Sequence, residues 1–160
     1  MTVALWRIAA DTPDYEADDL SGKGAEKTGG RWNREGRPVV YAASTAALAC
    51  LETVIHFNAD ALPFNRFLVR IEVPDDVLRA CVRASAQELR VGWTAVPAGK
   101  VSLDFGDAWL RLGTSTLLAV PSVVVPEESN VLINPAHPDA ARITATKVRP
   151  WLYDSRFRPR

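Results

Sequence analysis

The hydrophobic positions of this chain repeat with the period of a strand in some segments and with that of a helix in others. The clearest strand is predicted at residues 67–73, where every second residue from Phe67 to Val73 is apolar and Pro74 ends the run. Further strands are predicted at residues 5–8, 39–43, 130–133 and 148–153, and in two pieces within 117–126 that Pro121 interrupts and Pro126 closes.

Residues 44–56 have helical periodicity and begin with Ser44, a residue type that favours the N-cap of a helix. The apolar side chains at helical spacing are Leu48, Leu51 and Ile55. Glu52 lies one turn after the first of these and one turn before the last, so it shares their face. A helix that packs this face has to remove a carboxylate from water, which is costly unless the acid is paired or borders a cleft. Glu52 is therefore the first candidate functional residue.

The remaining segments carry loop signals and short helices. Residues 11–30 form a long polar, glycine-bearing loop with at most a short helix, and loops of this length are often functional. Residues 75–112 predict short helices and turns, most clearly at 104–111, and a further short helix is predicted at 139–142. Strands outnumber the helices that could cross between parallel strands. We therefore expect an α+β fold of bent, mostly antiparallel sheets with short helices.

Composition limits the classes of protein to consider. With 160 residues, 48% of them hydrophobic, the chain suits one domain spanning 1–160. Nineteen basic and nineteen acidic residues cancel, so charge gives no argument for a nucleic-acid or membrane partner. The N-terminal segment does not resemble a signal peptide and no run is long enough to span a membrane, so we expect a cytosolic protein. Two cysteines without CxxC spacing and two histidines predict buried thiols and no metal site.

One group of residues suggests chemistry. Gly29 and Gly30 allow a ligand to approach the backbone, and Arg31 follows them with planar donors suited to a phosphate. Tyr41 offers an aromatic face, and Glu52 could orient a sugar hydroxyl or stabilise a cation at an anomeric carbon. Taken singly, each has a structural alternative. Arg31 could form a surface ion pair, Tyr41 could belong to the core, and Glu52 could be an acid paired with an arginine.

Other positions are open to two interpretations. Arg7, beside Trp6, is either a strand-edge residue with a stacked cation or a ligand contact. Ser122 lies inside an apolar run and either bonds the backbone at a strand break or faces a cleft, and without G-x-S-x-G around it a hydrolase nucleophile is disfavoured. Residues 22–30 match a phosphate loop in composition but not in spacing. The arginines at the C-terminal end indicate a solvated tail or, less readily, a nucleic-acid contact; they are Arg149, Arg156, Arg158 and Arg160.

Several separated motifs, in order from about Leu5 to the end, resemble the RES domain. These are Gly30-Arg31-Trp32-Asn33 with Gly36, Val40-Tyr41-Ala42-Ala43-Ser44-Thr45, Ala47-Leu48-Ala49, Leu51-Glu52, Pro121-Ser122 and Asn130-Val131-Leu132-Ile133-Asn134-Pro135-Ala136-His137-Pro138. The family is named for an arginine, a glutamate and a serine, which match Arg31, Glu52 and Ser122. Its members are toxins of bacterial toxin-antitoxin pairs.

The resemblance implies a fold similar to the catalytic domains of ADP-ribosylating toxins and NAD as the substrate. Arg31 would hold an NAD phosphate, Tyr41 would stack on the nicotinamide and Glu52 would work at the nicotinamide ribose. Ser122 would help to shape the pocket and Arg7 would add a phosphate contact. The implied catalytic set is thus Glu52, Ser122 and Tyr41, and the implied NAD-binding set is Arg31, Arg7, Tyr41 and Trp32, with no metal or second cofactor.

The resemblance also implies partners. One is an antitoxin with a helix-turn-helix DNA-binding region that covers or enters the active site, so that the toxin itself touches no DNA. The acceptor of ADP-ribose stays open among water, inorganic phosphate and a target protein. A non-catalytic nucleotide- or partner-binding module of the same fold is the alternative, and a nucleic-acid enzyme that uses the basic C-terminal end is a third hypothesis.

Overall fold

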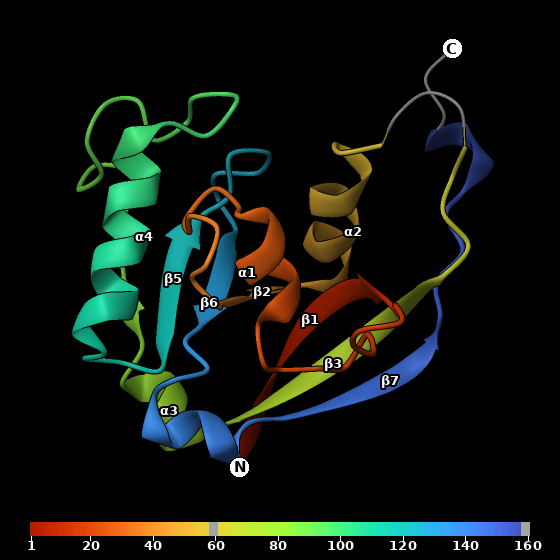
Figure 1. The fold of residues 1–160 in the computed structure, drawn as a ribbon, viewed down its shortest axis with the longest axis horizontal. Coiled ribbons are helices and arrows are strands. Elements are labelled where there is room, and N and C mark those ends of the chain that lie inside the picture. The colour runs from red at the N-terminus through yellow and green to blue at the C-terminus, as the bar shows by residue number, and fades with distance from the viewer. Residues whose placement is uncertain (58–60, 158–160) are drawn as a thin grey trace.

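The strands form one seven-stranded sheet in the order β4-β5-β6-β2-β1-β3-β7, antiparallel throughout except for the β4–β5 pair (Figure 1). The structure is a computed structural model that describes residues 1–57 and 61–157. Its strands are β1 (Thr2–Ala10), β2 (Val40–Ala43), β3 (Arg66–Pro74), β4 (Val82–Arg83), β5 (Leu117–Pro121), β6 (Ser129–Ile133) and β7 (Thr144–Pro150). The predicted α+β class with a mostly antiparallel sheet is confirmed.

Short helices connect and cover the strands. They are α1 (Lys23–Thr28), α2 (Ala46–Val54), α3 (Asp75–Arg79), α4 (Lys100–Leu112) and the 3-10 helices η1 (Pro138–Arg142) and η2 (Ser155–Phe157). The short helix expected within the long loop at 11–30 is α1, and the one expected at 139–142 is η1. None of the helices in the described residues has both the length and the apolar character needed to cross a membrane.

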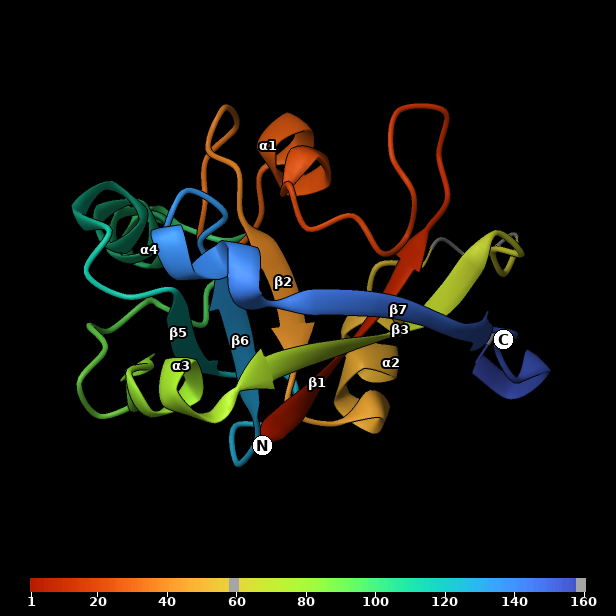
Figure 2. The same ribbon diagram turned by 90° about the horizontal axis from the view of Figure 1, so that it is seen from below.

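The sheet is divided at its middle. Strands β1 and β2 are paired only through Trp6 and Ala43, whereas β1 pairs with β3 along its whole length. The two halves, β4-β5-β6-β2 and β1-β3-β7, consequently run in different directions, as Figures 1 and 2 show. Beyond a single pair of residues the two strands diverge, and this divergence leaves room for a site between the halves.

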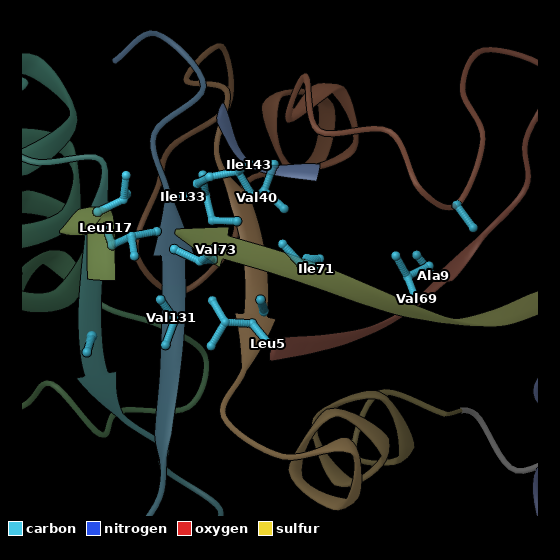
Figure 3. Packing of buried hydrophobic residues seen from close by; sticks show 14 residues of the cluster. Leu5, Ala9, Val40, Val69, Ile71, Val73, Leu117, Val131, Ile133 and Ile143 are labelled. Atoms are coloured by element: carbon cyan, nitrogen blue, oxygen red, sulfur yellow. The ribbon is translucent and has the colours of Figure 1, made fainter. Parts of the chain in front are cut away.

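The largest core cluster lies where the two half-sheets face each other. Figure 3 shows side chains of one half, such as Val131 and Ile133, directed toward those of the other, such as Leu5 and Ile71. The alternation predicted for β3 is confirmed, because Val69, Ile71 and Val73 are fully buried in this cluster. Burial of large aliphatic side chains contributes roughly 1.5–3 kcal/mol each, so this cluster fixes how the two halves meet.

Helix α2 differs from its prediction in detail. Its N-cap is Thr45 rather than Ser44, since the Thr45 hydroxyl accepts a hydrogen bond from the Leu48 N–H at 3.1 Å. Leu48 is fully buried, but Ile55 is 53% exposed, so the expected stripe does not extend to the end of the helix. The helix packs on β1 and β2, with Leu48 buried in the adjoining core cluster and Val54, its last residue, partly buried against the same cluster.

Two segments predicted to be strands also differ from their predictions. The second piece of the strand expected within 117–126 is a turn instead, because the Ser122 hydroxyl accepts hydrogen bonds from the N–H groups of Val124 and Val125 and bends the chain. The last strand lies at Thr144–Pro150, earlier than the expected 148–153, since it pairs with β3 over that range. The helix expected at 104–111 is confirmed as part of the longer helix α4, which spans Lys100–Leu112.

Candidate active site

A pocket of about 410 Å³ opens where β1 and β2 diverge. Its lining residues come from the 22–31 segment that includes α1, from β1 and β2, and from α2, elements whose arrangement can be followed in Figure 1. Four residues singled out from the sequence line this one pocket, namely Arg7, Arg31, Tyr41 and Glu52. Segments far apart in sequence thus place two guanidinium groups, an aromatic ring and a carboxylate around one cavity.

Glu52 is the acid of this pocket. It lies on α2 one turn after the buried Leu48, is itself half-buried, and borders the cavity as the helical pattern predicted. Its Oε1 accepts hydrogen bonds from the Ser122 hydroxyl at 2.6 Å and from the Asn130 side-chain amide at 2.8 Å. The carboxylate is therefore satisfied by neutral donors rather than by the arginine that the structural alternative required.

Ser122 lies behind Glu52 and outside the pocket. Its side chain is fully buried in the turn after β5, and it contacts Glu52 but does not line the cavity. The first interpretation of this serine fits, because it bonds the backbone at a strand break. It does not face the cleft and reaches the site only through Glu52. The expectation that it works directly in catalysis does not fit this position.

Asn130 is a site residue that sequence reasoning missed as such. It lies on β6, lines the pocket and donates to Glu52. The sequence feature that could have identified Asn130 is similar to the one that identified Glu52. Asn130 is a polar residue two positions before Leu132, so it shares a strand face with a fully buried side chain. In the sequence it entered only as part of the family motif.

Arg31 is oriented by backbone carbonyls. Its Nη1 donates to the Trp93 carbonyl at 3.0 Å and to the Ala95 carbonyl at 2.8 Å. In the part of the chain that the structure describes, no protein group accepts from Nε or Nη2, so these donors remain available in the pocket. The alternative of a surface ion pair does not apply within those residues.

Tyr41 joins β2 to the glycine-rich loop. Its hydroxyl accepts from the Trp32 N–H at 3.0 Å and donates to Asn33 Oδ1 at 2.7 Å, while the side chain lines the pocket. Burial raises the pKa of Tyr41, against the opposing effect of the Trp32 N–H, so the phenol stays neutral. A Cβ atom on Gly30 would lie 2.7 Å from this hydroxyl, which explains why a glycine occupies the position.

Trp32 does not line the pocket, which corrects the prediction that this residue contacts NAD. The side chain is 2% exposed and packs against Trp93 and Phe105, with ring centroids 6.3 Å and 5.9 Å away. The large apolar indole contributes more when it is buried against these rings than it would in a polar cleft. Gly106 permits close packing, because a Cβ atom there would collide with the Trp32 carbonyl.

The loop that carries Arg31 is also tied to α4 by charge. The Arg34 guanidinium donates to Asp107 at 2.7 Å and to Asp104 at 2.6 Å, and the Arg34 N–H donates to Asp107 at 3.2 Å. Asp107 is buried, so its two oxygens are satisfied by one residue of the loop. The cationic wall of the pocket is thus attached to the longest helix.

Arg7 lines the pocket from β1. Its Nη1 donates to the Asp19 carbonyl at 3.1 Å, and burial lowers its pKa while Asp19 and Tyr15 oppose that effect. Arginine nevertheless remains charged at neutral pH. A partly desolvated cation at this position favours a bound anion, so the ligand-contact interpretation fits Arg7 better than that of a strand-edge residue.

A second cavity of about 340 Å³ adjoins the first. The two share six lining residues, Arg7, Ile8, Tyr15, Glu52, Thr53 and His56, and the second adds side chains at the end of α2 and the start of β3, including Phe57 and Arg66. Glu52 therefore borders both cavities.

Other expectations from the sequence concern residues away from the pocket. Cys50 is buried and Cys81 half-buried, both as free thiols whose pKa burial raises. Over residues 1–57 and 61–157, histidine, cysteine, aspartate and glutamate form no group of three that could hold a metal. Arg149 stacks on Trp151 and Arg156 pairs with Asp154, whereas Arg158 and Arg160 lie outside the described residues.

Comparisons with known proteins agree with the motifs. The family model of the RES domain matches residues 4–155. The "Prs ADP-ribosylating toxin" of Sphingobium sp. is 62% identical over 157 residues, which cover 98% of both chains. A "Toxin Res" of Pseudomonas putida is 39% identical over 155 residues, 96% of this chain and 98% of that one. A "Toxin Res" of Yersinia enterocolitica is 39% identical over 124 residues, 77% of this chain and 79% of that one.

Proposed function

The chain belongs to the RES-domain family, and from this premise we propose that it is a toxin that cleaves the nicotinamide N-glycosidic bond of NAD and transfers ADP-ribose to an acceptor. The similarity to an ADP-ribosylating toxin supports an enzyme of the ADP-ribosyltransferase type. The observation that carries the proposal is the meeting of Glu52 with Arg7, Arg31 and Tyr41 around one pocket.

The proposed chemistry follows from charge. When the bond between nicotinamide and ribose breaks, nicotinamide leaves with the bonding electron pair and positive charge develops on the ribose. A fixed carboxylate such as Glu52 stabilises that charge without reorganising during the reaction. The acceptor then forms a bond to the anomeric carbon and loses its proton to the carboxylate or to water.

The two arginines suit the other half of the substrate. NAD carries a pyrophosphate, and the free donors of Arg31 together with Arg7 would hold it and so fix the ribose beside Glu52. The ring of Tyr41 would stack on the nicotinamide. NAD serves here as a substrate, and the proposed chemistry uses no metal.

The second cavity supports a transfer reaction. NAD and an acceptor must meet at the anomeric carbon, and Glu52 borders two adjoining cavities that could each admit one of them. The name of the relative from Sphingobium sp., an ADP-ribosylating toxin, favours a protein acceptor, with water and inorganic phosphate as the other acceptors.

We further propose that the toxin arrests growth in the cytoplasm unless an antitoxin neutralises it. The relatives named "Toxin Res" support an antitoxin partner. A helix-turn-helix region on that partner would account for any DNA binding, because the toxin carries no net charge to attract nucleic acid itself.

Mass spectrometry of the products from isotope-labelled NAD tests the proposal. The purified protein, the Glu52→Ala variant and a control variant are each incubated with NAD, phosphate and lysate. The control is Glu127→Ala, which removes an exposed carboxylate near the turn that follows β5. Wild type and the control should release nicotinamide, and Glu52→Ala should not. Free ADP-ribose, ADP-ribose phosphate or a labelled protein would identify the acceptor.

Equal inactivity of all three proteins would refute the enzymatic proposal. If calorimetry then showed that NAD binds without any product, the non-catalytic binding module would be the better account. If instead truncation after Tyr153 abolished toxicity while NAD chemistry stayed intact, the basic C-terminal end would be the functional element.

A further inference from the structure

The two oxygens of the Glu52 carboxylate have different surroundings. Oε1 accepts from the Ser122 hydroxyl at 2.6 Å and from the Asn130 amide at 2.8 Å. Among residues 1–57 and 61–157, no protein group donates a hydrogen bond to Oε2. Because Glu52 lines the pocket, this second oxygen is the one available to a ligand.

Ser122 has no bonding capacity left for a substrate. Its oxygen accepts from the N–H groups of Val124 at 3.0 Å and Val125 at 3.1 Å, which occupy both lone pairs. The single hydroxyl hydrogen must therefore point to Glu52. The geometry makes Ser122 a fixed donor, oriented by the backbone of the turn.

Asn130 is also held in place, by strand pairing rather than by the turn that orients Ser122. It lies on β6 between two partner strands, where it is paired with Ala43 of β2 and with Val120 of β5. Its backbone cannot shift without disturbing both pairings. A side chain on such a rigid element holds its partner within a narrow range of positions.

We propose that Asn130 is a positioning residue that, together with Ser122, fixes Oε1 of Glu52 so that Oε2 faces the ribose as the working oxygen. This inference rests on the proposed function. Two donors approaching one oxygen from separate elements set the rotation of the carboxylate, which neither donor could set alone. The ligand then meets a carboxylate that is already oriented, as stabilisation of a developing cation requires.

Kinetics of Asn130→Ala test the positioning role. We expect kcat for nicotinamide release to fall about 10-fold or more while KM for NAD changes little, because the orientation of Glu52 matters most in the transition state. The control is Asn134→Ala, which removes a buried amide from just after the same strand without touching Glu52. An unchanged kcat in a folded N130A protein would overturn the proposal, as would an equal loss in the control.

Asn130→Asp gives a readout that does not depend on turnover. A second carboxylate beside Glu52 would make the pair retain a proton to higher pH, because two adjacent negative charges repel. In ¹³C NMR of glutamate-labelled protein, with the Glu52 signal assigned by its loss in Glu52→Gln, the midpoint for Glu52 should move upward by about one pH unit. Asn134→Asp should leave it unchanged.

The two measurements separate failure of this inference from failure of the proposed function. A wild-type protein that releases no nicotinamide would count against the proposed function, while the NMR shift would still report whether Asn130 contacts Glu52. If the N130D midpoint stays at the wild-type value, Asn130 does not hold the carboxylate and the inference is wrong.

Discussion

The two walls of the pocket are held in different ways. The cationic wall around Arg31 is held by backbone carbonyls, buried aromatic rings and the Arg34 ion pairs with α4. The acidic wall is one carboxylate on α2 held by two side-chain donors, Ser122 and Asn130. Loop packing thus sets the first wall, and two hydrogen bonds set the second.

This difference predicts which properties each wall controls. Changes that disturb the cationic wall should affect folding and NAD binding together, because the same contacts fix the loop and the arginine. Changes at the acidic wall should lower turnover and spare folding, since a single amide or hydroxyl can be removed without opening the core. Each of the following substitutions tests one side of this contrast.

The largest expected effect is that of Gly106→Ala. The added Cβ would collide with the Trp32 carbonyl, so the loop or α4 has to move. We expect a loss of about 3 kcal/mol or more in the free energy of unfolding, measured by urea denaturation, together with weaker NAD binding. Gly99→Ala is the matched control at the N-cap of the same helix, where an added Cβ would meet Ala95 at an ordinary 3.8 Å. Equal stability of both variants would show that the loop is not packed as described.

Arg31→Ala should weaken NAD binding about 10-fold to 100-fold by calorimetry, because charge-assisted contacts to a phosphate are lost. Arg31→Lys should recover only part of the affinity, since an ammonium group cannot make a two-pronged contact. The control is Arg37→Ala, an exposed arginine from the same segment that does not line the pocket. If the Arg31→Ala protein binds NAD like wild type, Arg31 holds only the 93–95 segment and not the substrate.

Tyr41→Phe separates the ring from the hydroxyl. Without the hydroxyl, the Trp32 N–H and the buried Asn33 amide oxygen each lose a partner, and we expect a loss of about 1–3 kcal/mol in thermal or chemical unfolding. NAD affinity should fall together with stability, because the two lost contacts also fix the loop that carries Arg31. Tyr15→Phe, from the same pocket lining, serves as the control. A large loss of NAD affinity with full stability would instead give the hydroxyl a direct role in binding.

The smallest expected effect concerns pH. Hydrogen bonds from Lys100 and Arg34 lower the pKa of Asp104 in the folded protein. The exposed ion pairs of Asp104 therefore stabilise the fold fully at a pH above the ordinary pKa of aspartate. This stabilisation is lost as the pH falls through the lowered pKa. The melting temperature should therefore fall slightly below about pH 4, and less so in Asp104→Asn. Glu127→Gln is the control. Identical pH curves for D104N and wild type would show that this contact does not stabilise the loop.

Much of the acidic wall could be predicted from the sequence, but not the means by which it is held. Glu52 was found because a charged residue interrupts an apolar helical pattern, which is local information. Asn130 carried a similar signal on a short strand, where a polar residue is too common to be diagnostic. That Ser122 meets Glu52 across 70 positions depends on the sheet order, which no local pattern specifies.

The cationic wall was predicted less completely. The glycines before Arg31 indicated close approach of a ligand, and Arg31 and Tyr41 do line one pocket. Trp32 was misassigned because its burial depends on contacts with Trp93 and Phe105, which lie 61 and 73 positions away and which no local pattern around Trp32 specifies. The divided sheet was not predictable either, since it arises from the single residue pair between β1 and β2.

The most direct test of the account is the rate of nicotinamide release from Glu52→Gln saturated with NAD, measured in a single turnover. Saturation removes differences in binding, and glutamine keeps the size of the side chain while losing its charge. We predict that the variant binds NAD nearly as well as wild type and releases nicotinamide at least about 100-fold more slowly. Release at the wild-type rate would contradict the central claim that this carboxylate stabilises the ribosyl cation.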